Sequence, residues 1–142
     1  MVGEFGRILL GDDLGRNWTE IAAPVPNSLM SVQFRDTRNG VAVGLEGALL
    51  VTRDGGQQWE TVDLGVRDHL FDILWASDRN QWFASGALGR WVSGDGGSWK
   101  SGTLDEHNLS WHTRALAVGS SLWLAGADIG RWDGNHWSPL KP

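Results

Sequence analysis

Cysteine and tyrosine are absent from the 142-residue sequence, and each absence removes a class of chemistry. Without cysteine there is no disulfide framework, no thiolate metal site and no cysteine nucleophile. Without tyrosine there is no phenolic nucleophile or general acid. No apolar run approaches the roughly 18 to 20 residues that a membrane-spanning helix needs, so the sequence predicts no membrane span.

Basic residues are also scarce. Ten arginines and two lysines stand against 17 acidic residues, which gives a net charge of −5 and a pI near 5.2. Because phosphate binding requires clustered Lys and Arg, this balance argues against a nucleic-acid partner. The N-terminus lacks a basic stretch followed by an apolar one, so we identify no signal peptide. The default expectation is a cytoplasmic protein, unless the sequence is a fragment of an exported one.

Glycine and tryptophan are abundant, with 20 and 10 residues, and they recur at a regular interval. The segment 44–59, which runs from a glycine to a tryptophan, has relatives at 3–18, 86–99 and 126–137. The closing tryptophans are separated by 41, 40 and 38 residues: Trp18, Trp59, Trp99 and Trp137. A period near 40 residues, made of short strands and glycine-rich turns, is typical of β-propeller blades.

Each full period divides into four short apolar segments, as at 29–34, 41–44, 48–52 and 58–63, so it predicts one four-stranded antiparallel blade. The sequence therefore predicts a single all-β domain over 1–142, with a half blade at 1–24 and blades at about 28–64, 66–104 and 107–140. Three and a half blades would leave apolar faces and strand edges uncovered. We expect either self-association, such as a homodimer that completes a ring, or a piece of a longer propeller.

The last hairpin turn of each period carries an acid, a glycine and a tryptophan. The best copy, Thr52-x-Asp54-x-Gly56-x-x-Trp59, resembles the Asp box, or bacterial neuraminidase repeat. The carboxylate would accept backbone N–H groups across the turn, and the tryptophan would pack over the hairpin. We expect a structural role for four acids and four tryptophans: Asp13, Asp54, Asp95, Asp133, Trp18, Trp59, Trp99 and Trp137.

Catalytic signatures are missing. Asp boxes occur in sialidases, but the sialidase nucleophile is a tyrosine, so that mechanism is excluded. No carboxylate pair stands outside the repeat pattern, no nucleophile elbow is present, and the histidines show no metal-ligand spacing: His69, His107, His112 and His136. We predict no catalytic residue, no metal and no cofactor, and we expect a protein that is not an enzyme. A glycoside hydrolase is kept as a third hypothesis.

A Gly-Arg pair follows the second strand of three periods, and acids occupy the same turns. Propeller symmetry predicts equivalent places for these arginines near one face. Either each arginine pairs with an acid of a neighbouring blade, or together they grip carboxylates or a protein segment. The candidate binding residues are Arg7, Arg90, Arg131, Glu4, Glu46 and Asp128, with Arg67, Arg79 and Arg114 as further candidates.

Six tryptophans exceed what the Asp boxes require: Trp75, Trp82, Trp91, Trp111, Trp123 and Trp132. Packing between blades would account for them. Alternatively, they stack on sugar rings or anchor an interface. A carbohydrate-binding propeller is therefore the main rival to a protein-interaction scaffold.

Segments 3–9 and 39–59 resemble the photosystem II stability/assembly-factor propeller family, and the resemblance is strongest over residues 1–104. The chain has about half the usual length of the family and no export signal. The resemblance implies a seven-bladed fold and, in photosynthetic organisms, an assembly chaperone that binds a reaction-centre subunit through an arginine-rich surface. It favours a non-enzymatic binding scaffold of undefined partner, with Arg7, Arg90 and Arg131 as the matching surface.

Overall fold

A computed structural model describes residues 1–12 and 14–141, and over these ranges the ordered elements are strands and one-turn 3-10 segments. The first two strands form a two-stranded sheet, blade 1: β1 (Ile8–Gly11) and β2 (Trp18–Ile21). Blade 2 contains β3 (Leu29–Phe34), β4 (Gly40–Gly44), β5 (Leu49–Thr52) and β6 (Glu60–Thr61). Blade 3 contains β7 (Leu70–Ala76), β8 (Gln81–Gly86), β9 (Arg90–Gly94) and β10 (Trp99–Thr103). Blade 4 contains β11 (His112–Val118), β12 (Ser121–Gly126), β13 (Ile129–Trp132) and β14 (Trp137–Pro139).

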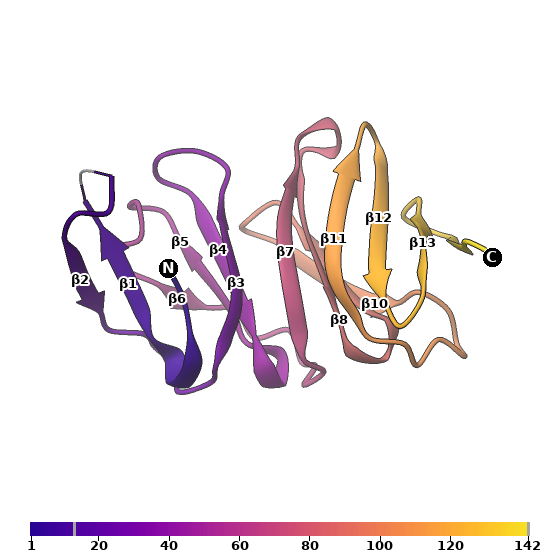
Figure 1. The fold of residues 1–142 in the computed structure, drawn as a ribbon, viewed down its shortest axis with the longest axis horizontal. Coiled ribbons are helices and arrows are strands. Elements are labelled where there is room, and N and C mark those ends of the chain that lie inside the picture. The colour runs from indigo at the N-terminus through magenta and orange to yellow at the C-terminus, as the bar shows by residue number, and fades with distance from the viewer. Residues whose placement is uncertain (13, 142) are drawn as a thin grey trace.

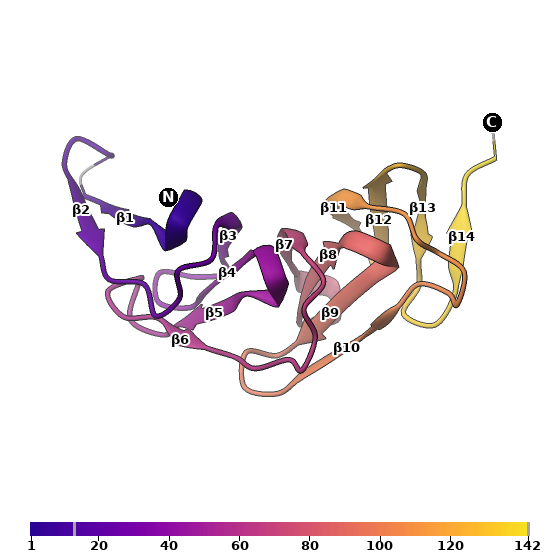
Figure 2. The same cartoon turned by 90° about the horizontal axis from the view of Figure 1, so that it is seen from below.

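Within each blade, consecutive strands are antiparallel neighbours, as short glycine-rich turns require. The blades fan out along an arc, with β3, β7 and β11 on its inner side and β6 and β10 on its outer side (Figures 1 and 2). The prediction of an all-β fold with four-stranded antiparallel blades, about three and a half in the chain, is confirmed.

Blade 1 has only a remnant of a strand on the inner side of β1. Met1 donates its terminal amine to the Leu9 carbonyl at 2.8 Å, and the Leu9 N–H donates to the Met1 carbonyl at 2.9 Å. Val2 bridges Ile8, and the Gly3 N–H bonds the Arg7 carbonyl at 3.0 Å. Residues 1–3 thus take the place that the last residues of β4 take in blade 2.

The hydrophobic core lies in layers between successive blades. We call the side of a blade that faces the preceding blade its front, and the side that faces the next blade its rear. The layer between blades 2 and 3 joins rear residues such as Val43 and Val51 to front residues such as Ile73 and Val92, all buried. Each such buried side chain contributes about 1.5–3 kcal/mol relative to exposure. Stacking of blades, more than any one sheet, therefore stabilises this fold.

The inner strands are joined edge to edge by side chains. The innermost strand of a blade has one unpaired edge, and its N–H groups need acceptors. The Asp72 carboxylate accepts from the Ser31 hydroxyl at 2.9 Å and from the Ala115 N–H at 2.9 Å, so it links β3, β7 and β11. Likewise, the Gln33 amide oxygen accepts the Trp75 N–H at 2.8 Å. Asp72 is the residue that ties three blades together at the inner side of the arc.

The predicted Asp-box acids accept backbone N–H groups within their own turns, in two geometries. Asp54 accepts from Gln57 and Gln58 at 3.0 Å each and from the Thr52 hydroxyl at 2.9 Å, across the connection 53–58. In the shorter connections 95–98 and 133–136, Asp95 and Asp133 each accept from the residues two and three positions later, at 2.8 Å.

In the first copy, the Asp12 carboxylate accepts the Asn17 N–H at 3.0 Å. The predicted acid of that copy, Asp13, lies outside the described residues.

Replacing Asp72 by Ala should lower the free energy of unfolding by about 1–3 kcal/mol, because the half-buried Ala115 N–H and the Ser31 hydroxyl lose their shared acceptor. Asp63→Ala is the matched control, since Asp63 is exposed and accepts the N–H of Gly65, two residues along its own loop; its effect should stay within about 0.5 kcal/mol. Urea denaturation measures both. Equal losses in the two variants would show that Asp72 has no special role in joining the blades.

Acid should weaken the fold through the turn carboxylates. Backbone N–H groups of Asn39 and Arg38 lower the pKa of Asp36 to about 2, from an ordinary 3.8. Because the folded pKa lies below the unfolded one, this contribution is fully present above about pH 4 and is lost as the pH falls toward 2. The urea midpoint of the wild type should therefore drop over this range. Asp36→Asn should flatten the drop, whereas Glu106→Gln, which removes an exposed carboxylate, should leave it unchanged.

Candidate functional site

The turns between the second and third strands lie at one edge of the blades, which we call the turn face. It comprises three 3-10 segments, η1 (Glu4–Gly6), η2 (Leu45–Gly47) and η4 (Ala87–Gly89), and the hairpin 126–128. Two glycines make the second of these turns possible. A Cβ on Gly44 would collide with the Ser28 carbonyl, and Gly47 has a φ of +74°.

The middle residue of each 3-10 turn is held in the left-handed region although it is not glycine. The φ angles are 54° at Phe5, 57° at Glu46 and 56° at Leu88. All three side chains are exposed. Such a conformation costs about 1–3 kcal/mol and persists only where the surroundings impose it. The repeated strain presents three outward-pointing side chains on the turn face.

A side chain from the next blade caps the first two of these turns. The Phe5 N–H donates to the Ser28 hydroxyl at 3.2 Å, and the Glu46 N–H donates to His69 Nδ1 at 3.0 Å. The corresponding residue for the third turn is Trp111, whose side chain has no acceptor atom. Trp111 therefore does not serve the capping function of Ser28 and His69, and its indole is 49% exposed.

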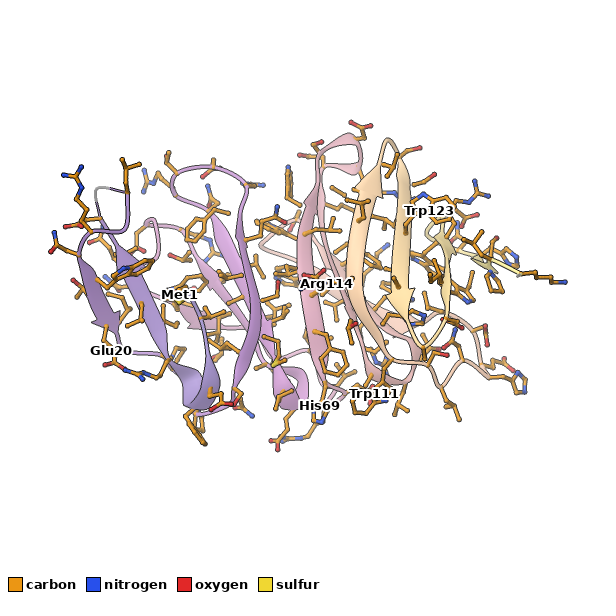
Figure 3. All side chains as sticks on the ribbon, in the orientation of Figure 1. Met1, Glu20, His69, Trp111, Arg114 and Trp123 are labelled. Carbon is orange, nitrogen blue, oxygen red and sulfur yellow. The ribbon has the colours of Figure 1, made fainter. Side chains whose placement is uncertain are left out.

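Trp111 belongs to an aromatic cluster with His69 and Phe71, at the N-terminal ends of β7 and β11 (Figure 3). The Phe71 and Trp111 rings lie 5.3 Å apart with a 32° tilt, and His69 lies 6.3 Å from each, edge-on. Phe71 is the extra residue of a β-bulge in the innermost strand, as Met30 is in β3. Sequence reasoning missed this cluster, although it did count Trp111 among the surplus tryptophans.

Two of the predicted arginines occupy equivalent places, and the third does not. The tryptophans align the strands, because Trp18, Trp99 and Trp137 lie opposite residues 11, 94 and 132. Arg7 and Arg90 each lie four residues before those positions, but Arg131 lies only one residue before. The expected equivalence of Arg131 is therefore wrong, because a tighter hairpin replaces the 3-10 turn in blade 4. Asp128 stands at the arginine position instead.

Arg7 and Arg90 both make ion pairs within their own blade region. Arg7 Nε lies 3.3 Å from Glu20, with both side chains exposed, and Arg90 Nε lies 2.7 Å from the half-buried Asp68. Exposed pairs such as the first contribute at most about 1 kcal/mol. Arg7 and Arg90 therefore do not pair with an acid of a neighbouring blade, as one of the two expectations had it.

The predicted acids of the turn face differ in their surroundings. Glu4 is exposed, and Glu46 accepts from the Asn27 side chain at 3.3 Å. Asp128 lies 2.5 Å from Nε2 of the buried His112 and also accepts the Ser110 hydroxyl at 3.2 Å. Serine and histidine both contact the carboxylate and not each other, so this trio lacks the serine–histidine contact that would activate a nucleophile.

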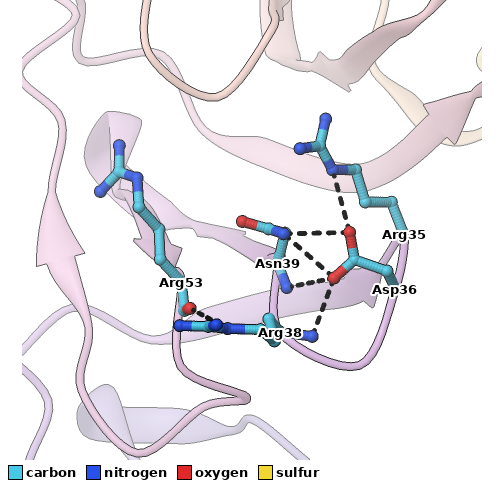
Figure 4. Close-up of polar contacts among 5 residues, drawn as sticks. All are labelled: Arg35, Asp36, Arg38, Asn39 and Arg53. Atoms are coloured by element: carbon cyan, nitrogen blue, oxygen red, sulfur yellow. Dashed lines mark hydrogen bonds and ion pairs between the residues drawn. The ribbon is translucent and has the colours of Figure 1, made fainter.

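At the edge of the blades opposite the turn face, arginines of one blade donate hydrogen bonds to the next blade. Arg53 donates to the Gly96 carbonyl at 3.0 Å, and Arg79 donates to the Asp133 carbonyl, so each reaches the Asp-box turn of the following blade. Arg35 pairs with Asp36 at 3.4 Å and lies over the Trp75 ring, and Arg38 donates to the Arg53 carbonyl (Figure 4). This edge is therefore occupied by structural contacts.

Most surplus tryptophans are core residues. Trp82 and Trp132 are buried, Trp75 packs on Trp82, and Trp91 packs on Trp132.

Among residues 1–12 and 14–141 no cluster of His, Asp and Glu is suited to a metal ion. In the same ranges, no helical segment has the length and apolarity to cross a membrane.

Comparison with known proteins agrees with this architecture. Residues 12–70 match the family described as "Photosynthesis system II assembly factor YCF48". The chain is 40% identical over 52 residues to the photosystem II assembly protein Ycf48 of Thermosynechococcus vestitus, a match that covers 37% of this chain and 15% of that protein.

Two solved structures share the fold. YCF48 from Cyanidioschyzon merolae has a TM-score of 0.71 at 18% identity, covering 86% of this chain and 42% of that one. A structure of YCF48 bound to D1 peptide has a TM-score of 0.73 at 20% identity, covering 99% of this chain and 45% of that one. The chain thus spans less than half the length of the relatives it matches. The blades and the shared fold identify the chain as a β-propeller, and its residues 12–70 are similar to the photosystem II assembly-factor family.

Proposed function

We propose that this chain is a non-enzymatic scaffold whose turn face binds an extended segment of a partner protein. The observation that carries the proposal is the exposed Trp111, which has no capping role and packs against the half-buried Phe71 near the outward-pointing turn residues. Exposed aromatic rings held rigidly by a scaffold are typical anchors of protein interfaces. The binding of a D1 peptide by a propeller of the same fold supports this mode of action.

The surroundings of the pair favour a partner segment that carries an apolar anchor residue and, near it, a basic residue. Leu88 of η4 and Leu109, two residues before Trp111 in the chain, are also exposed apolar side chains. Glu4 and Glu46 are exposed acids of the turn face, whereas Arg7 and Arg90 are engaged by Glu20 and Asp68. A segment that places an aliphatic or aromatic side chain on Trp111 and a Lys or Arg near Glu46 would meet both features.

Trp111→Ala should weaken binding of the segment by about 2 kcal/mol, or roughly thirty-fold, as expected for a central aromatic anchor. The first probe is a fluorescent D1 peptide, with a scrambled peptide as the negative control, and anisotropy measures the affinity. Trp18→Ala is the matched variant, since Trp18 is an exposed tryptophan at the far end of the arc; its affinity should equal that of the wild type.

The same titration tests the alternative that the predicted arginines, and not the aromatic pair, bind the segment. A variant with Arg7, Arg90 and Arg131 all changed to Gln should keep most of the affinity if the aromatic pair is the anchor. Loss of binding in this variant, with Trp111→Ala unaffected, would move the site to the arginines. Equal binding of the D1 and scrambled peptides by the wild type would remove support for recognition of a specific segment.

A further inference from the structure

The three 3-10 turns of the turn face follow one another in a row, one on each of blades 1, 2 and 3. Viewed from this edge, they are three short coils along the arc (Figure 2). Ser28 joins η1 to η2, because its hydroxyl accepts from η1 and its carbonyl accepts the Leu45 N–H at 2.9 Å. His69 joins η2 to η4 in the same way, with its ring on η2 and its carbonyl on the Ala87 N–H at 2.9 Å. These bonds fix the order and spacing of the turns.

The middle residue of each turn is an unusual choice for its backbone conformation. Phe5, Glu46 and Leu88 all have a positive φ, between 54° and 57°. Glycine adopts this region freely, and asparagine and aspartate are enriched there among the other residues. None of these stands at the three positions, and burial does not account for the side chains present, because all three are exposed. Strain retained without burial points to side chains that act at the surface.

Exposure at this position is a property of the turn itself. Blades 2 and 3 each have a blade packed on both sides, yet Glu46 is exposed and Leu88 is 44% exposed. Phe5 takes the same position in η1, where Ser28 of the next blade bonds its N–H, and it is 81% exposed. The row therefore stays open where blades lie on both sides of a turn.

The two ends of the row are apolar. Phe5 presents an exposed aromatic ring, and Leu88 presents an exposed aliphatic side chain. Trp111 extends the second end, because the Gly89 N–H of η4 bonds the carbonyl of Ser110, the residue before Trp111, at 2.8 Å. Each end thus offers an apolar contact for a side chain of a partner.

The middle of the row is acidic and hollowed. Glu46 borders a hollow of about 440 Å³, whose lining includes a second exposed acid, Asp63, and one exposed base, Arg67. The acids outnumber the base, so the hollow favours a cation over an anion. A Lys or Arg side chain suits it, because the long apolar stem would fill the hollow while the charged end reaches the carboxylates.

The spacing of the blades limits the conformation of a segment that contacts all three turns. Packed β-sheets lie about 10 Å apart, so the turns of successive blades recur at roughly this interval. A polyproline II segment has three residues per turn and rises about 3.1 Å per residue, so it returns to the same face about every 9 Å. Every third residue of such a segment would meet the next turn of the row.

We infer that the row binds one segment of the partner in this extended conformation. The segment carries an apolar, a basic and an apolar residue at three-residue intervals, for contact with Phe5, Glu46 and Leu88 in that order or its reverse. This inference rests on the proposed function, in which Trp111 is the anchor, and it adds the sequence pattern that the partner must have.

Selection from a displayed library of random peptides of about twelve residues, on the immobilised full chain, tests the pattern. Enriched peptides should carry a Lys or Arg with an apolar residue three positions away on each side. Glu46→Arg should change the middle residue to Asp or Glu and keep the apolar flanks, because only the charge of the hollow is reversed. Asp78→Arg is the matched control, since Asp78 is an exposed acid of the β7–β8 turn at the opposite edge; it should leave the wild-type pattern unchanged.

The outcomes separate this pattern from the proposed function. Peptides that lose binding on Trp111→Ala but show no preferred charge between their apolar residues would support the anchor and overturn the pattern. A library with no enriched peptide would overturn both. A dimer in light scattering that Phe5→Asp dissolves would identify a second copy of the chain as the occupant, and would also overturn the pattern.

Glycine substitutions separate a binding role of the row from a structural one. Phe5→Gly and Leu88→Gly should each raise the urea midpoint, because glycine relieves the strain at a positive φ. Each should also weaken an enriched peptide by about tenfold, because an apolar contact is lost. Asn80→Gly is the control, since Asn80 is exposed with a φ of 50° at the opposite edge; its peptide affinity should equal that of the wild type. Unchanged affinity in both row variants would overturn the inference.

Discussion

The unpaired inner edge of each blade is the constraint on which this fold depends. A stack of blades turns one strand edge of every sheet toward the inside of the arc, where backbone donors still need acceptors. The chain meets this need with side chains from the preceding blade: Ser31 and Gln33 serve β7, and Asp72 serves β11. Because these acceptors come from another blade, the same contacts that satisfy an edge also set the spacing of the blades.

The turns obey a second constraint, which is local. Asp-box carboxylates satisfy backbone donors inside each outer hairpin, and Ser28 and His69 satisfy the strained turns on the opposite edge. Where the residue at the capping position has no acceptor atom, its side chain does not bond the strained turn. Trp111 occupies the capping position but has no acceptor, and its exposed indole is the consequence.

Much of the fold could be predicted from the spacing of the tryptophans, because they recur at a constant place in the strand register. Trp59, Trp99 and Trp137 also pack in the layer between their own blade and the preceding one. The site could not be predicted in the same way. Gly130-Arg131 looks like Gly89-Arg90 in sequence, but a shorter hairpin moves Arg131 three residues along its strand. The Phe71–Trp111 contact joins a bulge to a residue 40 positions later, and no periodic signal reports that pair.

Comparison among the repeats separates two kinds of departure from the common pattern. Many positions of blades 2 and 3 are buried in a layer between blades, so their residue types follow from packing. Trp18 and Trp59 share one position and differ in exposure from 47% to 8%, and the difference is due only to the missing neighbour in front of blade 1. Trp111 differs from Ser28 and His69 in chemistry, at a position where all the neighbours are present. The first kind of departure follows from packing alone, whereas the second is a change of side-chain chemistry that packing does not explain, which is why the proposed binding site is placed at Trp111.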